Sequence, residues 1–237
     1  MLATILTIGN ELVSGDVENS NAAWLARRLE RAGVKVVLTA AVPDELDRIV
    51  GFVRREAPLV DHVFVTGGLG STPDDITREA LAAAFAVGQA VVPELEAELR
   101  ARFEGEVDPY FLRWTQLPEG AAPLRNPLGG APGFRIGNVW VLPGLPAEME
   151  AMFDAAAGAI AAGPPIGSWR RRLQGLTERR INPLLEEATA RWPVVLVGSY
   201  PSFPPGGPQV EVVLKSSDPD ALAEAAAFLD SGLDALA

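Results

Sequence analysis

The sequence predicts an α/β protein, in which a mostly parallel sheet carries helices on both faces and a small α+β unit follows. Between residues 2 and 66, short apolar runs alternate with segments whose apolar residues recur at helical spacing. Strands and helices that alternate in this way form a parallel sheet through right-handed crossover connections. The prolines and glycine of residues 164–167 are typical of a linker. We therefore expect one domain over residues 1–163 and a second over residues 168–237.

The elements of the first domain follow in order from apolar runs and helix signals. Strands are expected at the apolar runs of residues 2–8, 34–42, 62–66 and 139–142. The first helix starts at the cap residues 19–21 and ends at Gly33. Further helices are expected at residues 44–57, 73–87, 93–106 and 146–153. Residues 108–137 are rich in Pro and Gly, and a loop of this length inside a domain is more often functional than idle.

The second domain has a simpler pattern. From residue 170 onward we expect a helix, strands at residues 194–197 and 210–214, and a last helix at residues 220–229. This order indicates a small α+β unit.

Composition excludes several classes of protein. Hydrophobic residues make up 48% of the chain and charged residues 22%, which excludes a disordered chain. A net charge of −11 argues against nucleic acid as a partner, because phosphate backbones require a concentrated basic surface. No apolar stretch is long enough to span a bilayer, and the start lacks the basic region of a signal peptide. We therefore expect no membrane partner and a cytoplasmic location.

Cysteine and histidine usage restricts the chemistry. The chain has no cysteine and a single histidine, His62, which excludes disulfides, thiol catalysis and clusters of thiolate or imidazole ligands. Any metal would need oxygen ligands. We expect His62 and the five tryptophans, Trp24 and Trp114 among them, to fill the core rather than to contact a ligand.

Three loops share one pattern, an apolar strand, a turn with glycine and then a helix with carboxylates at or near its start. They cover residues 9–15, 67–75 and 143–148. In an open parallel sheet such loops all leave the carboxyl edge of the strands, where ligands bind. The three loops should therefore converge on one site.

The middle loop is the most informative of the three. Gly67, Gly68 and Gly70 let backbone N–H groups approach a ligand, which would suit a phosphate. Asp74 and Asp75 are expected in the first turn of the following helix, where two carboxylates would repel a phosphate directly. A divalent cation held between carboxylates and phosphate oxygens resolves this conflict. Alternatively, a carboxylate accepts hydrogen bonds from ribose hydroxyls or from a pterin ring.

The same residues also make an ordinary helix start. Thr72 as the N-cap, a proline at the first helical position and acidic residues in the first turn complement the helix dipole. Capping and function therefore both stay open for Asp75. Glu148 has the same ambiguity, and Glu11 could be a solvated turn residue.

Five ordered motifs resemble a known family. They lie at residues 8–22, 66–77, 126–134, 142–149 and 198–201. Together they resemble the molybdopterin-binding-like domain of the CinA (competence/damage-inducible) family over nearly the whole chain. The sequence departs from the family pattern at Ser71 and Leu145, where Pro and Val are usual, and over residues 177–185.

The resemblance implies a fold and an activity. It implies a three-layer α/β/α domain like that of the MoaB and MogA proteins, followed by a small α+β domain. It also implies metal-dependent hydrolysis of the pyrophosphate bond of ADP-ribose or of a related dinucleotide such as FAD. Many members carry a C-terminal amidase domain that acts on nicotinamide mononucleotide. This chain stops before that domain, so we expect no deamidase activity.

We therefore expect a nucleotide pyrophosphatase that uses Mg²⁺, Mn²⁺ or Co²⁺ and acts on a small-molecule nucleotide or pterin. The expected catalytic residues are Asp75, Asp74 and Glu11, and the expected metal ligands are Asp74, Asp75 and Glu148. The expected substrate contacts are Gly67, Gly68, Gly70, Thr72, Asn19, Asn21, Asn126, Gly144, Ser199 and Tyr200. Two alternatives stay open: a pterin-binding or adenylyl-transfer protein of molybdenum cofactor synthesis, and a nucleotide-binding regulator without turnover. A homo-oligomer is compatible with either.

Overall fold

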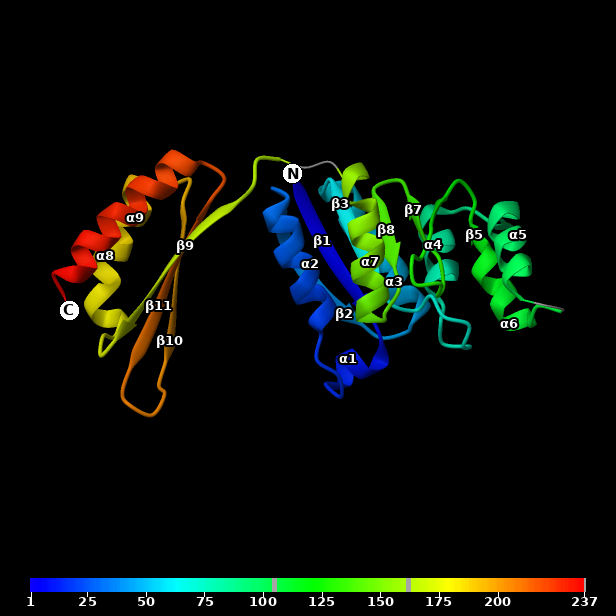
Figure 1. Cartoon of the computed structure of the whole chain (residues 1–237), viewed down its shortest axis with the longest axis horizontal. Helices are drawn as coiled ribbons and strands as arrows, with labels where there is room; N and C mark the ends of the chain where they lie inside the picture. The colour runs from blue at the N-terminus through cyan, green and yellow to red at the C-terminus, as the bar shows by residue number, and fades with distance from the viewer. Residues whose placement is uncertain (104–105, 161–162, 237) are drawn as a thin grey trace. The chain divides into compact units, whose positions relative to one another are not determined.

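The chain divides into two compact units. The computed structural model describes residues 1–103, 106–160 and 163–236. Met1–Glu30 and Val34–Ala162 form the first unit, and Arg31–Gly33 and Gly163–Ala237 form the second (Figure 1).

The first unit is built on a six-stranded sheet of order β2-β1-β3-β8-β7-β6. Its strands are β1 (Leu2–Ile8), β2 (Lys35–Val42), β3 (His62–Thr66), β6 (Ala122–Leu124), β7 (Gly133–Ile136) and β8 (Val139–Leu142). Strands β2, β1, β3 and β8 are parallel to one another. Strand β7 pairs antiparallel with β8, and β6 pairs antiparallel with β7. Thr7 pairs with Thr66, which in turn pairs with Leu142, so the central strands end side by side. The predicted mostly parallel sheet is confirmed.

Helices cover both faces of this sheet, as predicted. Helices α2 (Ser20–Arg31) and α7 (Pro146–Ala156) pack on one face, and α3 (Leu46–Glu56) and α4 (Thr77–Phe85) pack on the other. Along β1, Ile5 belongs to the first of these cores and Leu6 to the second, because successive side chains of a strand point to opposite faces. Both are fully buried, which explains the mostly apolar run of β1.

Several shorter elements complete the first unit. They are α1 (Asn10–Ser14), η1 (Ala57–Leu59), β4 (Gln89–Val91), α5 (Pro93–Arg102), α6 (Pro109–Leu112), η2 (Arg113–Thr115), β5 (Gln116–Pro118) and η3 (Ala157–Ala159). The stretch 108–137, expected as a loop, thus contains two short helices and three short strands. The helix expected at residues 73–87 begins only at Thr77, and the helix expected to reach residue 106 ends at Arg102.

The second unit is a three-stranded antiparallel sheet of order β10-β11-β9, with two helices packed on one face (Figure 1). Its elements are β9 (Gly167–Gln174), α8 (Glu178–Arg191), β10 (Leu196–Ser202), β11 (Gln209–Ser216) and α9 (Pro219–Asp234). Strand β9 was not predicted, because a charged residue, Arg171, interrupts the face that Trp169 and Leu173 turn to the core. Arg171 is accommodated by ion pairs with Asp230, at 2.7 Å, and Asp234. In the part of the chain that the structure describes, no helix has the length and apolar character needed to cross a bilayer.

Gly51→Ala is expected to raise the free energy of unfolding by about 0.5–1 kcal/mol, since alanine restricts the unfolded chain and favours helix. Gly51 lies inside α3, and a Cβ there would meet no atom within 4 Å. Urea unfolding measures the effect. The matched control is Gly232→Ala in α9, where the new Cβ would lie 2.7 Å from Leu184 Cδ2, so the gain should be smaller. A loss of stability in Gly51→Ala would contradict the prediction.

Candidate functional site

The three loops that follow β1, β3 and β8 converge, as predicted. Asn21 on α2 joins two of the strand ends, because its Nδ2 donates to Thr66 Oγ1 at 3.0 Å and to the Gly144 carbonyl oxygen at 2.8 Å. The N–H of Gly67 donates to the carbonyl oxygen of Leu142 at 3.2 Å. These contacts fix the relative positions of the middle and last loops.

Gly67 allows the middle loop to pack against the end of β1, and Gly68 allows it to pack against the start of α4. Gly67 and Gly68 have φ values of +108° and +64°, a region that side chains disfavour. A Cβ on Gly67 would lie 2.2 Å from the carbonyl oxygen of Ile8, and one on Gly68 would lie 2.2 Å from Thr77 Oγ1. Thr77 Oγ1 donates to the Gly67 carbonyl oxygen at 2.8 Å. Gly67 and Gly68 thus form a surface without side chains, which we call the floor of the site. A residue with a Cβ would clash at either position.

This floor belongs to a cleft of about 620 Å³, a volume within the usual range of small-molecule sites. Residues of all three loops line it, including Gly67, Gly68, Gly70 and Gly144. Five carboxylates also line it: Glu11, Asp44, Asp74, Asp75 and Glu148. None of the described residues that line it is a lysine or an arginine. The cleft therefore combines exposed backbone with a strongly negative wall.

Asp75 organises its own loop, and its predicted place in the first helical turn is wrong. Its Oδ1 accepts the N–H of Gly70 at 2.9 Å, and its Oδ2 accepts both the N–H of Thr72, at 2.8 Å, and the Thr72 hydroxyl. These bonds hold residues 70–75 as a turn, so the helix starts at Thr77. The adjacent Asp74 is exposed, and hydrogen bonds from Thr72 and from its own backbone lower the pKa of its carboxyl group.

A buried arginine, Arg78 on α4, supports this loop from behind. It is 1% exposed, and its guanidinium donates to the carbonyl oxygens of Leu69, at 2.5 Å, and Gly70, at 3.2 Å. Burial lowers the pKa of Arg78 to about 10, although the charges of Glu79 and Asp75 oppose the shift. The sequence analysis did not predict that Arg78 supports the loop. The available signal was an arginine at a position where the helix face is otherwise apolar.

Arg113 on η2 holds the same loop from a distant part of the chain. Its Nη1 donates to the carbonyl oxygen of Thr72 at 3.0 Å, and its Nη2 donates to that of Asp75 at 3.1 Å. Nη2 also lies 3.0 Å from Glu79 Oε1. No local sequence signal identifies this contact, because its partners lie about forty residues earlier.

Asp44 is a fifth cleft carboxylate that sequence reasoning missed. It follows β2, whose carboxyl end lies at the same edge of the sheet, so the strand-end rule that found the other loops could have found it. Burial is the main cause that raises the pKa of Asp44, and the negative charges of Glu11, Asp74 and Asp75 raise it further. A hydrogen bond from the N–H of Asn10, at 3.0 Å, opposes this. The carboxylates are thus close enough to repel one another.

Glycines lie beside three of the cleft carboxylates. A Cβ on Gly130 would lie 2.3 Å from Glu148 Oε1, and one on Gly9 would lie 2.4 Å from Glu11 Oε1. Gly70 stands in the same relation to Asp75, at 2.4 Å from Oδ2. Three carboxylates therefore each lie against the bare Cα of a glycine.

The predicted metal ligands Asp74, Asp75 and Glu148 all line the cleft, but they are not placed as a ready-made metal-binding group. Across residues 1–103, 106–160 and 163–236, no three of the metal-ligating side chains gather as a metal-binding group. Both oxygens of Asp75 already accept hydrogen bonds. Glu148 accepts one from Asn126 Nδ2, at 2.8 Å, through Oε2. Mg²⁺ commonly takes one or two protein carboxylates and completes its shell with water and phosphate oxygens.

The predicted asparagines lie beside the cleft lining. Asn19 Nδ2 donates to Thr7 Oγ1 at 2.8 Å, and its Oδ1 accepts the N–H of Ala22, so both ends of its amide are used. Asn19 and Asn21 line a smaller hollow of about 100 Å³ that also includes Glu11. Asn126 and Thr72 act on cleft residues through the hydrogen bonds described above.

Ser199 and Tyr200, predicted as substrate contacts, lie on β10 of the second unit and are not among the residues that line the cleft. Ser199 Oγ donates to Glu178 Oε1 on α8. Tyr200 is 60% exposed, and its ring lies over Gly198.

Trp114 packs against the core, as expected, and it also has a face turned to open space. It is half-buried against the core, and it also lines the cleft and a second hollow beside it.

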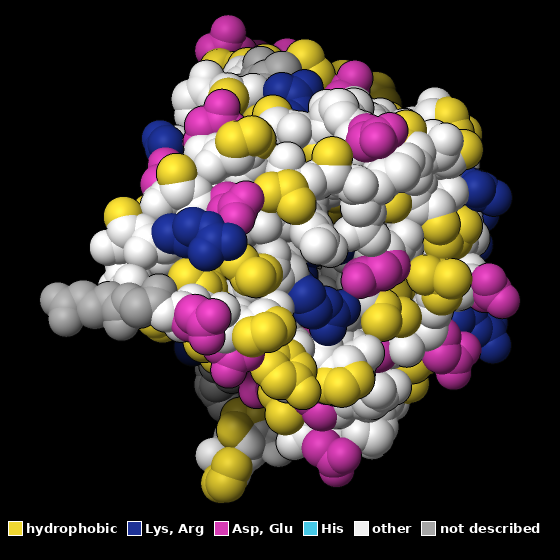
Figure 2. Space-filling model, turned by 90° about the vertical axis from the view of Figure 1, so that its right-hand side faces the viewer, with side chains coloured by type: hydrophobic (Ala, Val, Ile, Leu, Met, Phe, Trp, Pro, Cys, Tyr) yellow, Lys and Arg dark blue, Asp and Glu magenta, His cyan; other side chains and the backbone are white. Residues whose placement is uncertain are grey.

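The end of the first unit that carries α5 and α6 shows acidic, basic and hydrophobic side chains interspersed, with a basic side chain in a recess near its centre (Figure 2). His62 meets its expectation, because it is 4% exposed and accepts a hydrogen bond from Trp140 Nε1.

Comparisons with known proteins agree with this architecture. Residues 4–162 match a family described as a probable molybdopterin binding domain, and residues 174–236 match the middle domain of FAD synthase. A CinA-like protein of Frankia casuarinae is 44% identical over 168 residues, and one of Citrifermentans bemidjiense is 36% identical over 249 residues. These matches cover 66% and 99% of this chain, which spans 39% and 59% of the two relatives.

A solved structure extends the comparison. The crystal structure of CinA from Thermoplasma acidophilum, a protein of unknown function, is 33% identical and has a TM-score of 0.64. The match covers 68% of this chain and 98% of that one. On these matches, the chain belongs to the CinA family, and its first unit belongs to the family described as a probable molybdopterin binding domain.

Proposed function

We propose that the cleft binds a nucleotide with a divalent cation and hydrolyses the pyrophosphate bond of ADP-ribose or of a related dinucleotide such as FAD. One observation carries the proposal: five carboxylates and a floor of glycines line a single cleft, and none of its described lining residues is a lysine or an arginine. The glycines suit a phosphate, but the carboxylates repel it. A divalent cation between the carboxylates and the phosphate would remove this repulsion.

The hydrogen bonds of the site suggest how the roles divide. Asp74 and Glu148 would hold the cation, because Asp75 uses both of its oxygens to shape the loop. Glu11 comes from a different loop and is the candidate to take a proton from the attacking water. Gly67 and Gly68 would let the pyrophosphate approach the backbone. A divalent cation supplies charge neutralisation on the pyrophosphate and activates water when bound.

A second candidate is a protein that binds a pterin or an adenylylated pterin through the same loops. The match of residues 4–162 to a probable molybdopterin binding domain favours it, and the FAD synthase match also points to a nucleotide-type ligand. Both candidates share a small-molecule nucleotide or pterin as ligand.

One experiment separates the two candidates. The pure protein is incubated with ADP-ribose, FAD or adenylylated pterin, each with Mg²⁺, Mn²⁺ or Co²⁺, and AMP release is followed by chromatography. Release of AMP from ADP-ribose or FAD supports the pyrophosphatase. An absence of turnover combined with tight binding of the pterin supports the second candidate.

Hydrolysis of ADP-ribose is expected to stop in EDTA and to return when a divalent cation is added in excess. The carboxylate wall leaves the pyrophosphate without another source of positive charge in the cleft. Because the described ligating side chains do not gather in threes, calorimetry should also find that Mg²⁺ binds more weakly without nucleotide than with it. Full turnover in the presence of EDTA would contradict the cation requirement.

A further inference from the structure

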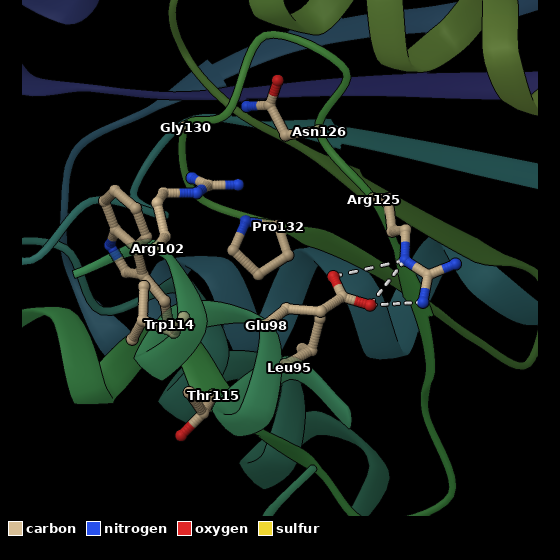
Figure 3. A pocket seen from close by; sticks show the side chains of 10 residues that line it. Leu95, Glu98, Arg102, Trp114, Thr115, Arg125, Asn126, Gly130 and Pro132 are labelled. Atoms are coloured by element: carbon tan, nitrogen blue, oxygen red, sulfur yellow. Dashed lines mark hydrogen bonds and ion pairs between the residues drawn. The ribbon is translucent and has the colours of Figure 1, made fainter. Parts of the chain in front are cut away.

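A second, smaller hollow adjoins the cleft and has the opposite charge. Its volume is about 150 Å³, and Trp114 lines both spaces. All charged side chains in the cleft lining are acidic, whereas the hollow is lined by two arginines, Arg102 and Arg125, and one carboxylate, Glu98 (Figure 3). Asn126 connects the two spaces, because it lines the hollow and donates to Glu148 in the cleft. The two spaces therefore share Trp114 and Gly130 as lining residues and are linked by one side-chain hydrogen bond.

The polar groups of the hollow are mainly donors. Arg125 pairs with Glu98, with 3.0 Å between Nε and Oε1. Arg102 instead donates to the carbonyl oxygen of Gly129, and within the described residues it has no carboxylate partner. Trp114 Nε1 is buried and donates to no other described residue. A ligand with hydrogen-bond acceptors would satisfy the guanidinium N–H groups of Arg102 that Gly129 does not use.

The walls of the hollow are apolar and include an aromatic face. Leu95 and Leu99 of α5 and the ring of Pro132 line it together with the indole of Trp114 (Figure 3). Phe111 supports the indole edge-to-face, at 4.9 Å between ring centroids. A flat ring that covers these walls would bury apolar surface and so bind favourably, whereas a phosphate group alone would bury little apolar surface. Guanidinium groups also stack on heteroaromatic rings.

We propose that this hollow binds the fused heteroaromatic base of a nucleotide whose phosphates lie in the cleft. Arg102 donates to acceptor atoms on the ring, and Trp114 offers its face. The inference rests on the proposed function for the position of the phosphates. It adds a substrate class, because the site then prefers nucleotides that carry such a base over sugar phosphates that lack one.

The test compares AMP with ribose 5-phosphate, which differs from AMP by the missing base. Calorimetry in Mg²⁺ measures the affinity of each ligand for the full chain. We expect AMP to bind at least about tenfold more tightly, a ratio within the usual worth of base stacking. Arg102→Met should remove most of this preference and leave the affinity for ribose 5-phosphate unchanged.

The matched control is Arg100→Met on the same helix. Arg100 is exposed, pairs with Glu96 at 2.6 Å and does not line the hollow, so the preference for AMP should persist. Trp114→Phe is a second, independent variant. It keeps a ring to pack on Phe111 but removes Nε1–H and part of the aromatic face, so AMP affinity should fall several-fold. Thermal melts verify that each variant is folded.

Equal affinity for AMP and ribose 5-phosphate in the unmodified protein would overturn the proposal. An equal loss for both ligands in Arg102→Met would also overturn it, because Arg102 would then hold the phosphate. Neither ligand has a pyrophosphate bond, so the result does not depend on turnover. If the protein prefers AMP but hydrolyses neither ADP-ribose nor FAD, the base site is supported and the pyrophosphatase activity is refuted. If it hydrolyses ADP-ribose or FAD but shows no preference for AMP, the pyrophosphatase activity is supported and the base site is refuted.

Discussion

Asp75→Asn is expected to lower kcat for ADP-ribose by at least about 10²-fold and to lower the melting temperature of the same preparation. The carboxylate accepts hydrogen bonds from Gly70 and from both the N–H and the hydroxyl of Thr72. Asparagine offers one acceptor oxygen, and its NH₂ group must then face a donor. Losing a hydrogen bond of this kind costs about 0.5–1.5 kcal/mol, and the loop that carries Asp74 loses its shape.

Asp74→Asn is the matched control for this prediction. Asp74 is exposed, so its substitution should lower turnover without a shift of the melt. The two variants together separate loop shape from cation binding. A melt of Asp75→Asn that falls by several degrees while kcat stays unchanged would show that Asp75 is a structural residue, and the reaction would then depend on Glu11 and Glu148.

Gly67→Ala is expected to have the largest effect on stability, a loss of roughly 2–5 kcal/mol in the free energy of unfolding. Alanine is strained at a φ of +108°, and its Cβ would lie 2.2 Å from the Ile8 carbonyl oxygen. That oxygen belongs to a central strand and cannot swing away as a side chain would. Any protein that still folds should have separated loops and should no longer bind nucleotide.

Urea unfolding and calorimetry with AMP check this result. The control is Gly158→Ala, at a position in η3 where a Cβ would meet no atom within 4 Å. It should leave both stability and binding near those of the unmodified protein. Unchanged stability in Gly67→Ala would mean that the middle loop does not pack against the end of β1 as described.

The parts of the fold that could be predicted from the sequence are those determined locally. Strands such as β1 and β3 are buried on both faces, so each is a mostly apolar run in which threonine and histidine are the polar residues. The order of strands and helices then requires a parallel sheet, and the sheet brings the three loops to one edge. That reasoning located most of the cleft before any side-chain position was known, including Glu11, Asp74 and Glu148.

The parts that could not be predicted depend on contacts between distant residues. Strand β9 has no clear alternating pattern in the sequence, because Arg171 lies on the face that packs against the helices. Asp230 and Asp234, some sixty residues later, pair with Arg171 and stabilise its charge there. The late start of α4 follows from the bonds of Asp75, reinforced by Arg113 from η2. Ser199, predicted as a substrate contact from the family resemblance, lies in the second unit, and that prediction stays open.

The glycines that stand against the cleft carboxylates affect how this site could be redesigned. Glu11, Asp75 and Glu148 each lie beside a glycine, so a side chain introduced at Gly9, Gly70 or Gly130 would compete with the carboxylate for the same space. Because the ends of Glu11 and Glu148 are flexible, a side chain at Gly9 or Gly130 would displace the acid from its present position. The charge arrangement of the cleft can therefore be altered at these glycines without replacing an acid.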